Sequence, residues 1–275
     1  MLEGVAATMS VEASRVDRKT SVSSVVDIVI PVYANEAQVR ACLSSVLAHK
    51  NESQGDIVVV NDCSPEPAVH RYLAALADQA LITLLTNEQN EGFIVSCNRG
   101  AAVHPDNDFV LLNADTEVHG NWLDRMVSHV EPGAKVASVT PFSNNATIAS
   151  YPTGATKPAA DEAVPIAAID QAMASANAGS SVALPTAIGF CMFVSREAWR
   201  ITGGFDKRYG RGYGEENEFC LATAALGWRH LLACDVFVYH AGGGSFGVES
   251  TRRKAEAQRI LDERYPDFSR QVQEW

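Results

Sequence analysis

Short apolar runs and stretches with helical spacing alternate along the first half of the chain. The apolar runs predict strands at residues 25–32, 56–60, 81–85, 109–112 and 136–140. Between them, apolar residues recur at helical spacing, which predicts helices over 36–49, 69–79, 93–102 and 122–130. Because the connections are short, this alternation is typical of a doubly wound, mainly parallel sheet with helices on both faces. The predicted fold class is therefore α/β.

Polar residues follow two of the predicted strands at their carboxyl ends. Asn61 and Asp62 come after the second strand, and Asn113 and Asp115 come after the fourth. In open α/β sheets, ligands bind in the crevice beyond these strand ends. Asp115 has two interpretations, a cap for the helix that follows or a contact to a metal or a polar ligand. The stretch taken alone favours the cap.

Residues 141–185 interrupt this rhythm, because they are rich in Ala, Ser, Thr and Pro and show little periodicity. A connection of that length inside a compact domain is usually a functional lid or disordered, so we expect a lid or acceptor loop. Later elements are predicted as strands over 187–194 and 230–240 and helices over 196–201 and 216–226. We expect a disordered leader or linker at 1–23, one domain over 24–249 and a charged helical tail at 250–275.

Charge and composition exclude several classes of protein. The chain has 22 basic and 33 acidic residues, a net charge of −11, which argues against nucleic-acid binding and broad contact with anionic lipid. No run approaches the ~20 apolar residues of a membrane span, and residues 1–23 lack the apolar core of a secretory signal. The six cysteines form no Cys-x-x-Cys pair, which fits buried free thiols in a reducing compartment. We expect a cytoplasmic protein, with peripheral attachment to the inner face of the membrane left open.

Three acids stand at the start of a predicted helix, after a glycine-rich turn. Glu215, Glu216 and Glu218 follow residues 212–214. The helix dipole favours acids in a first turn, so one interpretation is that they stabilise the helix end. The glycines of the turn also let the backbone approach a ligand closely, and a carboxylate beside such a turn suits a general base presented to a cleft. The residues alone leave both interpretations open.

Two further strand-end residues are candidates for ligand contacts. His240 ends the last predicted strand, in the same kind of position as Asp115. A lone histidine is more often structural, but an aspartate at another strand end makes it a candidate metal ligand. Asp62 stands where an acid commonly contacts a ribose or a base in dinucleotide folds. Residues 31–36 lack the Gly-x-Gly-x-x-Gly fingerprint, and no P-loop motif occurs, which disfavours dinucleotide oxidoreductases and P-loop nucleotidases.

Seven short segments, in this order and spacing, carry a resemblance to a known family. They are residues 30–36, 60–64, 90–93, 112–116, 143–146, 212–219 and 239–240. Over about residues 25–249 the chain resembles family 2 glycosyltransferases with the GT-A fold, in particular bacterial rhamnosyltransferase-like enzymes of cell-surface polysaccharide assembly. The resemblance implies a Rossmann-like mixed sheet and an inverting transferase. Such an enzyme moves a sugar from a nucleotide-diphosphate sugar to a hydroxyl of a saccharide or lipid-linked acceptor, with Mn²⁺ or Mg²⁺ as cofactor.

The resemblance also implies a role for individual residues. The nucleotide-sugar site matches Pro31, Tyr33, Glu36, Asp62, Asn90, Gly92, Asn113 and Asp115. Glu216 matches the general base, with Glu215 as its acidic neighbour, and Glu215 or Glu218 would grip acceptor hydroxyls. Gly189 and Phe190 match the floor of the acceptor side, and the metal ligands match Asp115 and His240.

One residue departs from the family pattern, because Asn113 stands where the DxD metal motif has its first aspartate. An asparagine still forms hydrogen bonds but brings no charge. This departure keeps open a non-catalytic nucleotide-sugar-binding module within a larger synthase. A sugar nucleotidyltransferase is a third hypothesis, but it would carry a basic Gly-rich loop where this chain has Ala34, Asn35 and Glu36. Further domains or a membrane-associated synthase complex are possible partners.

Overall fold

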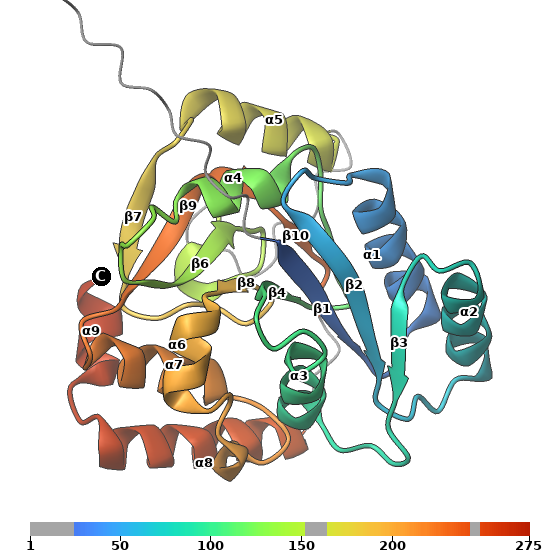
Figure 1. The fold of residues 1–275 in the computed structure, drawn as a ribbon. Coiled ribbons are helices and arrows are strands. Elements are labelled where there is room, and N and C mark those ends of the chain that lie inside the picture. Colours follow the sequence, from blue (N-terminus) through green and yellow to red (C-terminus); the bar gives the residue numbers. More distant parts are fainter. Residues whose placement is uncertain (1–24, 152–163, 243–247) are drawn as a thin grey trace, which may run out of the picture.

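The computed structural model describes residues 25–151, 164–242 and 248–275. These residues fold around an eight-stranded sheet in the order β3-β2-β1-β4-β8-β6-β9-β7 (Figure 1). The strands are β1 (Val26–Val32), β2 (Gln54–Asn61), β3 (Thr83–Thr86), β4 (Asp108–Leu112), β6 (Val136–Phe142), β7 (Ser181–Leu184), β8 (Cys191–Val194) and β9 (Arg229–Phe237). β1 pairs in parallel with β2 and β4, as β2 does with β3 and β6 with β9, whereas β7 and β8 run antiparallel to their neighbours. The predicted mixed, mainly parallel α/β sheet is confirmed.

Alternate residues of β1 belong to two separate hydrophobic clusters, one on each face of the sheet. Ile28 and Ile30 belong to the first cluster and Val29 to the second, as the two-residue period of a strand requires. The first cluster includes residues of α1 (Glu36–Ala48), α2 (Pro67–Asp78) and α4 (Trp122–Ser128). The second includes residues of α3 (Phe93–Ala101), α6 (Arg196–Thr202), α7 (Glu215–Ala224), α8 (Val248–Arg264) and α9 (Phe268–Glu274). Burial on both faces explains why β1 reads as a continuous apolar run.

Helix α3 approaches the sheet closely at Gly100. A Cβ added to Gly100 would lie 2.4 Å from Cγ1 of Val29 and 3.1 Å from Cγ2 of Val60. Only glycine allows this approach without a shift of the helix or of these valine side chains. The contact fixes α3, and with it the loop that precedes α3, against β1 and β2.

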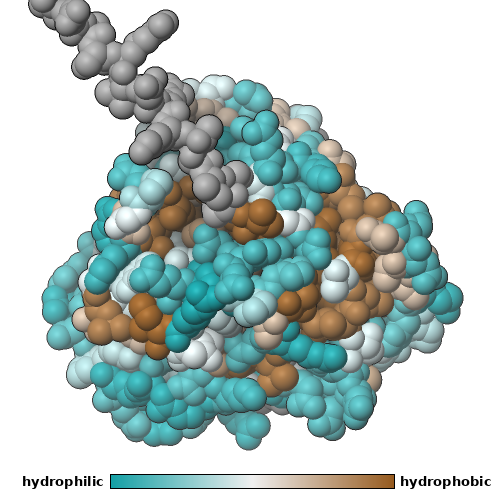
Figure 2. Space-filling model, in the orientation of Figure 1, coloured by the Kyte–Doolittle hydropathy of each residue, from teal (hydrophilic) through white to brown (hydrophobic). Residues whose placement is uncertain are grey.

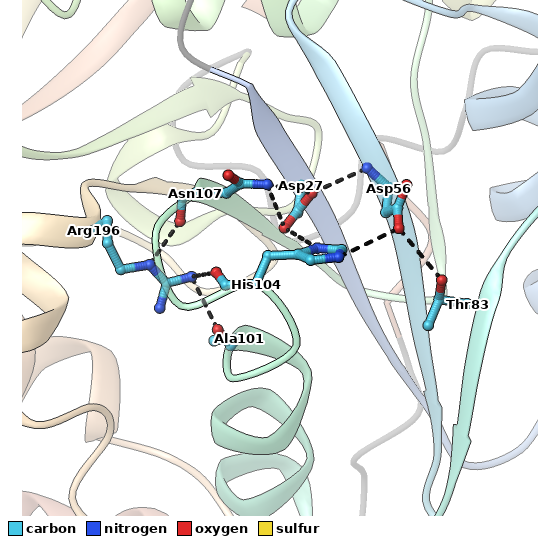
Figure 3. Close-up of polar contacts among 7 residues, drawn as sticks. All are labelled: Asp27, Asp56, Thr83, Ala101, His104, Asn107 and Arg196. Carbon is cyan, nitrogen blue, oxygen red and sulfur yellow. Dashed lines mark hydrogen bonds and ion pairs between the residues drawn. The ribbon is translucent and has the colours of Figure 1, made fainter.

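A polar cluster, in which Asp27 and Arg196 are buried, joins the elements at the amino-terminal edge of the sheet (Figure 3). The carboxylate of Asp27 accepts hydrogen bonds from the backbone N–H of Asp56 at 3.0 Å and from Nδ1 of His104 at 2.8 Å. The buried guanidinium of Arg196 donates to the carbonyls of Ala101, His104 and Asn107 at 2.9, 3.1 and 2.6 Å. These bonds satisfy carbonyls at and after the end of α3. This edge is therefore structural, and the candidate ligand residues lie at the opposite ends of the strands.

The prediction of a long loop over 141–185 is wrong for residues 164–185, which the structure describes. A helix, α5 (Ile166–Ala176), and strand β7 occupy that part, while residues 152–163 lie outside the described residues. Asp170 anchors α5, because its carboxylate accepts from the backbone N–H of Phe237 at 3.0 Å and pairs with Arg125 at 2.6 Å. The Ala-rich helix has few large apolar residues, so its periodicity is weak in the sequence. A lid role for 141–185 stays a prediction.

The charged tail packs on the domain. Ala257 and Leu261 of α8 and Phe268 of α9 are buried in the same hydrophobic cluster as Phe219 of α7. All six cysteines are free thiols, and four of them are buried, as expected. Within the described ranges, no helix combines the length and the apolar character needed to cross a bilayer.

Candidate active site

A pocket of about 290 Å³ brings together residues from distant parts of the chain. Six of the predicted site residues line it: Asn113, Gly189, Phe190, Glu215, Glu216 and His240. Asn113 follows β4 directly, and the acids begin α7. The pocket therefore lies at the carboxyl edge of the parallel strands, where α/β folds bind their ligands.

A small two-stranded sheet brings the predicted metal ligands together. Strand β5 (Thr116–Glu117) pairs with β10 (Tyr239–His240), and the backbone N–H of Ala241 donates to the carbonyl of Asp115 at 2.9 Å. As a result, Nε2 of His240 lies 3.3 Å from Oδ1 of Asp115. These strands are too short to produce a pattern in the sequence, so the pairing was not predicted.

The surroundings of His240 fix the orientation of its ring. Its Nδ1 lies 2.8 Å from the carbonyl of Asn145, and because a carbonyl only accepts, Nδ1 is the donor. The ring stacks on Phe190 at 5.3 Å between centroids. Burial by itself lowers the pKa of His240, but the hydrogen bond and the charge of Asp115, together with the Asn145 carbonyl, raise this pKa overall. With Nδ1 fixed in this way, Nε2 faces Asp115 and is the ring atom that could bind a metal.

The donor set fits a divalent cation that is held partly by its substrate. A nitrogen and a carboxylate oxygen 3.3 Å apart can share one cation, because metal–ligand bonds are about 2.0–2.2 Å long. Within the described residues, no group of three or more His, Cys, Asp or Glu side chains could hold a metal. Mg²⁺ commonly binds through one or two carboxylates plus substrate phosphates. Asp115 and His240 match that kind of site.

A strained turn aims the first residues of α7 into the pocket. Gly212, Tyr213 and Gly214 have φ values of 135°, 77° and 90°. Tyr213 is a bulky residue in the left-handed region, which costs energy and is frequent at functional sites. A Cβ on Gly214 would lie 2.9 Å from the Tyr209 ring. Close packing against Tyr209 therefore fixes the conformation of the turn.

Glu215 and Glu216 carry unsatisfied oxygens. Oε2 of each is buried, and neither has a hydrogen-bond partner among the residues that the structure describes. Burial raises the pKa of Glu215 well above its ordinary value, and the neighbouring charge of Glu216 raises it further. Burial also raises the pKa of Glu216. A carboxylate with a raised pKa and an unpaired oxygen is suited to take a proton from a bound hydroxyl.

Glu218 has a different environment from the two preceding acids. Its carboxylate accepts from the hydroxyls of Tyr209 at 2.9 Å and Tyr265 at 3.0 Å, and it pairs with Arg264 at 2.7 Å. It does not line the pocket with Glu215. The contacts make Glu218 a link between α7 and α8, and its predicted grip on the acceptor has no support in this geometry.

Asp62 holds the loop that precedes α3. Its carboxylate accepts from Nδ2 of Asn87 at 2.7 Å and from the backbone N–H groups of Glu91 and Gly92, both at 2.8 Å. Arg211 in turn donates to the carbonyl of Asn90 at 2.6 Å. The loop is thus joined to the turn before α7. The predicted contact of Asp62 with a ribose or base stays a prediction, but its role as a loop anchor was not foreseen.

The candidates on the first-strand segment lie outside the pocket. Tyr33 is exposed, and the carboxylate of Glu36 pairs with Arg40 on the same helix at 2.7 Å. Pro31 lies within β1, paired with Val60 of β2. Two residues that the sequence did not single out, Arg211 and Arg253, do line the pocket. The sequence features that could have indicated these two residues are weak. Arg211 stands between two glycines, and Arg253 belongs to a pair of arginines in the tail.

The described residues form a mixed α/β fold with acids and a histidine at the carboxyl edge of its strands. Residues 27–232 match Glycosyl transferase family 2, which is well over half of the chain, so the chain belongs to that family. An uncharacterized glycosyltransferase of Haemophilus influenzae is 23% identical over 114 residues, 42% of this chain and 35% of the relative. The chain thus spans about a third of the length of this relative.

Two solved structures share the fold at low sequence identity. GalNAc-T7, solved with UDP, GalNAc and Mn²⁺, superposes with a TM-score of 0.65 and 16% identity, over 89% of this chain and 49% of its own. The mannosyltransferase PcManGT of Pyrobaculum calidifontis, solved with GDP-Man and Mn²⁺, superposes with a TM-score of 0.58 and 18% identity. The match covers 86% of this chain and 62% of the chain of PcManGT. The predicted family and the predicted GT-A fold are confirmed.

Proposed function

We propose that this chain is an inverting glycosyltransferase. It moves a hexosyl or deoxyhexosyl group from a nucleotide-diphosphate sugar to a hydroxyl of a saccharide or lipid-linked glycan, in the assembly of cell-surface polysaccharide on the cytoplasmic side of the membrane. One observation carries the proposal. Glu215 and Glu216, each with a buried carboxylate oxygen that has no partner among the described residues, line the same pocket as His240, which lies 3.3 Å from Asp115.

Glu216 is the proposed base. Its carboxylate takes the proton of the acceptor hydroxyl as that oxygen attacks the anomeric carbon, and the bond to the diphosphate oxygen breaks. Its raised pKa brings it nearer to the working pH, where a base is most effective. Such a base typically contributes ~10²–10⁴-fold to the rate. Attack from the face opposite the diphosphate inverts the anomeric carbon.

Asp115 and His240 would hold a divalent cation, Mn²⁺ or Mg²⁺, against the diphosphate. When bound, the cation supplies Lewis-acid stabilisation of the charge that develops on the leaving group. GalNAc-T7 and PcManGT, which share the fold, were solved with Mn²⁺ and a nucleotide or nucleotide sugar. Asn113 lines the pocket and offers an uncharged amide to the sugar or the ribose.

A substitution and a binding measurement test the proposal together. A panel of nucleotide sugars with Mn²⁺ is first screened by thermal shift, since any specific ligand raises the melting temperature. With the donor identified, Glu216→Gln should retain donor binding by calorimetry and lose transfer by ~10²-fold or more. Near-normal transfer by this variant would refute the assignment of the base. Donor binding by the unaltered chain without any transfer or donor hydrolysis would instead support the non-catalytic module that Asn113 keeps open.

A further inference from the structure

A second pocket, more basic than the first, lies between η2 (Lys207–Tyr209) and α8. Its volume is about 470 Å³, within the range of sites for small ligands. Four arginines line it, with Glu256 as the acid among the lining residues: Arg208, Arg211, Arg252 and Arg253. Helix α8 runs along the lower edge of the molecule in Figure 1, and the surface there is hydrophilic in Figure 2.

The positive charge of this pocket stands out in an acidic chain. The net charge is −11, yet the residues that line this pocket include four arginines and a single acid. Glu256 pairs with Arg259 at 2.8 Å, and Arg208 is held by Asp206 through Nε at 2.7 Å. Arg252 is exposed and has no hydrogen-bond or ion-pair partner among the described residues. Gathering like charges costs energy that a bound anion would offset.

The chemistry of the lining selects a phosphate. A guanidinium offers five N–H donors in a planar fork that matches phosphate oxygens in pairs. Arg211 uses one of its terminal nitrogens on Asn90, which leaves other donors of the fork for a ligand. Neighbouring guanidinium groups around one cavity suit a phosphate or a diphosphate better than a single carboxylate, because each fork binds two oxygens.

The two pockets are adjacent, because Arg211 and Arg253 line both of them. Arg208 and Arg252 line only the basic pocket. A molecule whose hydroxyl lies at Glu216 therefore has a basic cavity next to it. Under the proposed function the donor diphosphate lies against Asp115 and His240, so a second anion in the basic pocket would belong to a different molecule.

We propose that the basic pocket between η2 and α8 binds a phosphate or diphosphate group of the acceptor. The inference rests on the proposed transferase function and narrows its acceptor to a phosphate-bearing glycan. It also explains the paired state of Glu218, since the bonds of Glu218 to Tyr209, Tyr265 and Arg264 hold α8 against η2. The pocket exists only while those two elements stay together.

The binding test uses inorganic pyrophosphate and the full chain, in EDTA and at low salt, followed by calorimetry. One pyrophosphate should bind per chain, and the paired substitution Arg208→Gln and Arg252→Gln should weaken binding by at least about tenfold, because charge-assisted bonds are lost. Arg270→Gln is the matched control, since Arg270 is an exposed arginine of the same tail that does not line the pocket. No binding by the unaltered chain, or equal loss in Arg270→Gln, would overturn the inference. So would loss in Asp115→Ala with retention in the paired variant, because the anion would then sit at the donor site.

A transfer assay separates the acceptor phosphate from other sources of the same chemistry. A saccharide and its phosphate ester are compared as acceptors, and the paired variant should raise KM at least about tenfold for the ester only, with donor KM unchanged. If the paired variant instead lost only its sedimentation with phosphatidylglycerol vesicles, the pocket would be a membrane contact and the inference would be wrong. Failure of the transferase proposal would show as absent transfer and absent donor hydrolysis by the unaltered chain. Pyrophosphate binding, measured without donor, does not depend on that outcome.

Discussion

Asp62 offers the sharpest test of how the crevice is built, through the substitution Asp62→Asn. Oδ1 accepts from Asn87 and from the backbone N–H of Glu91, and Oδ2 accepts from the N–H of Gly92 at 2.8 Å. An asparagine replaces one of these oxygens with an NH₂ group, which cannot accept. If the amide keeps its oxygen at the Oδ1 position, the buried N–H of Gly92 faces another donor.

The expected loss of stability follows from these three bonds. A hydrogen bond to a charged group contributes about 1.5–3 kcal/mol, and a buried donor left unsatisfied costs about 1–3 kcal/mol. The lost hydrogen bond and the unsatisfied donor describe partly the same loss, so their energies do not simply add. We expect Asp62→Asn to lower the free energy of unfolding by about 2–4 kcal/mol. For a chain of this size, 1 kcal/mol shifts the melting temperature by about 2–4 °C, so the shift should be roughly 5–15 °C.

Thermal and urea unfolding of the nucleotide-free chain measure this loss. Asp56→Asn is the control, because the Asp56 side chain is 56% exposed and its contact with Thr83 is long at 3.5 Å. We expect the control to stay within about 0.5 kcal/mol of the unaltered chain. Unchanged stability of Asp62→Asn, combined with lost nucleotide binding, would refute the reasoning. Asp62 would then act on the ligand and not on the loop.

Four further predictions concern the site and the core. Glu216→Gln should raise the melting temperature at pH 8 while transfer is lost, because a carboxyl whose pKa is raised by burial stabilises the fold below its ordinary pKa and loses that contribution as pH rises. Asp115→Ala should abolish manganese-dependent nucleotide binding in calorimetry, and unchanged binding would remove Asp115 from the metal site. Burial lowers the pKa of His230 to about 4, so the unfolded chain binds more protons between that value and about 6.5, and stability falls as the pH drops through this window. Urea unfolding at pH 7 and pH 5 should show that His230→Gln removes about 2 kcal/mol of this decline. Gly92→Ala should lower kcat at saturating donor, because its Cβ would lie 2.9 Å from Cα of Arg211 at φ 91°, whereas Gly227→Ala, at φ 81° with open space around it, should lose stability only.

The fold was predictable because its signals are local. The apolar runs that became β1, β2 and β4 are buried on both faces, so each strand appears in the sequence as an uninterrupted run. Elements held by distant contacts escaped prediction. α5 depends on Asp170 meeting Arg125 and Phe237, and β5 depends on its pairing with β10. No period in the sequence records a contact between residues that far apart.

The acids of the candidate site also show what the sequence alone cannot predict. Glu215, Glu216 and Glu218 occupy one helical turn, and residue type and spacing cannot separate their roles. Their partners do separate them. Glu218 has both oxygens occupied by tyrosines and an arginine, so it holds elements together, whereas Glu215 and Glu216 each keep a buried oxygen without a partner among the described residues. A buried acceptor left unpaired is costly unless a ligand supplies the donor.

The same criterion applies on the nucleotide side of the crevice. Asp62 has three donors from its own chain and acts as an anchor, while the carboxylate of Asp115 contacts, among the described residues, only the ring of His240 at 3.3 Å. Motif order locates both aspartates equally well, yet of the two only Asp115 keeps carboxylate electron pairs that could bind the proposed cation. The distinction arises because folding has already used the hydrogen-bonding capacity of some acids and has left that of others for the ligand. Where the capacity remains, a substitution should change binding or transfer, and where it has been used, a substitution should change stability first.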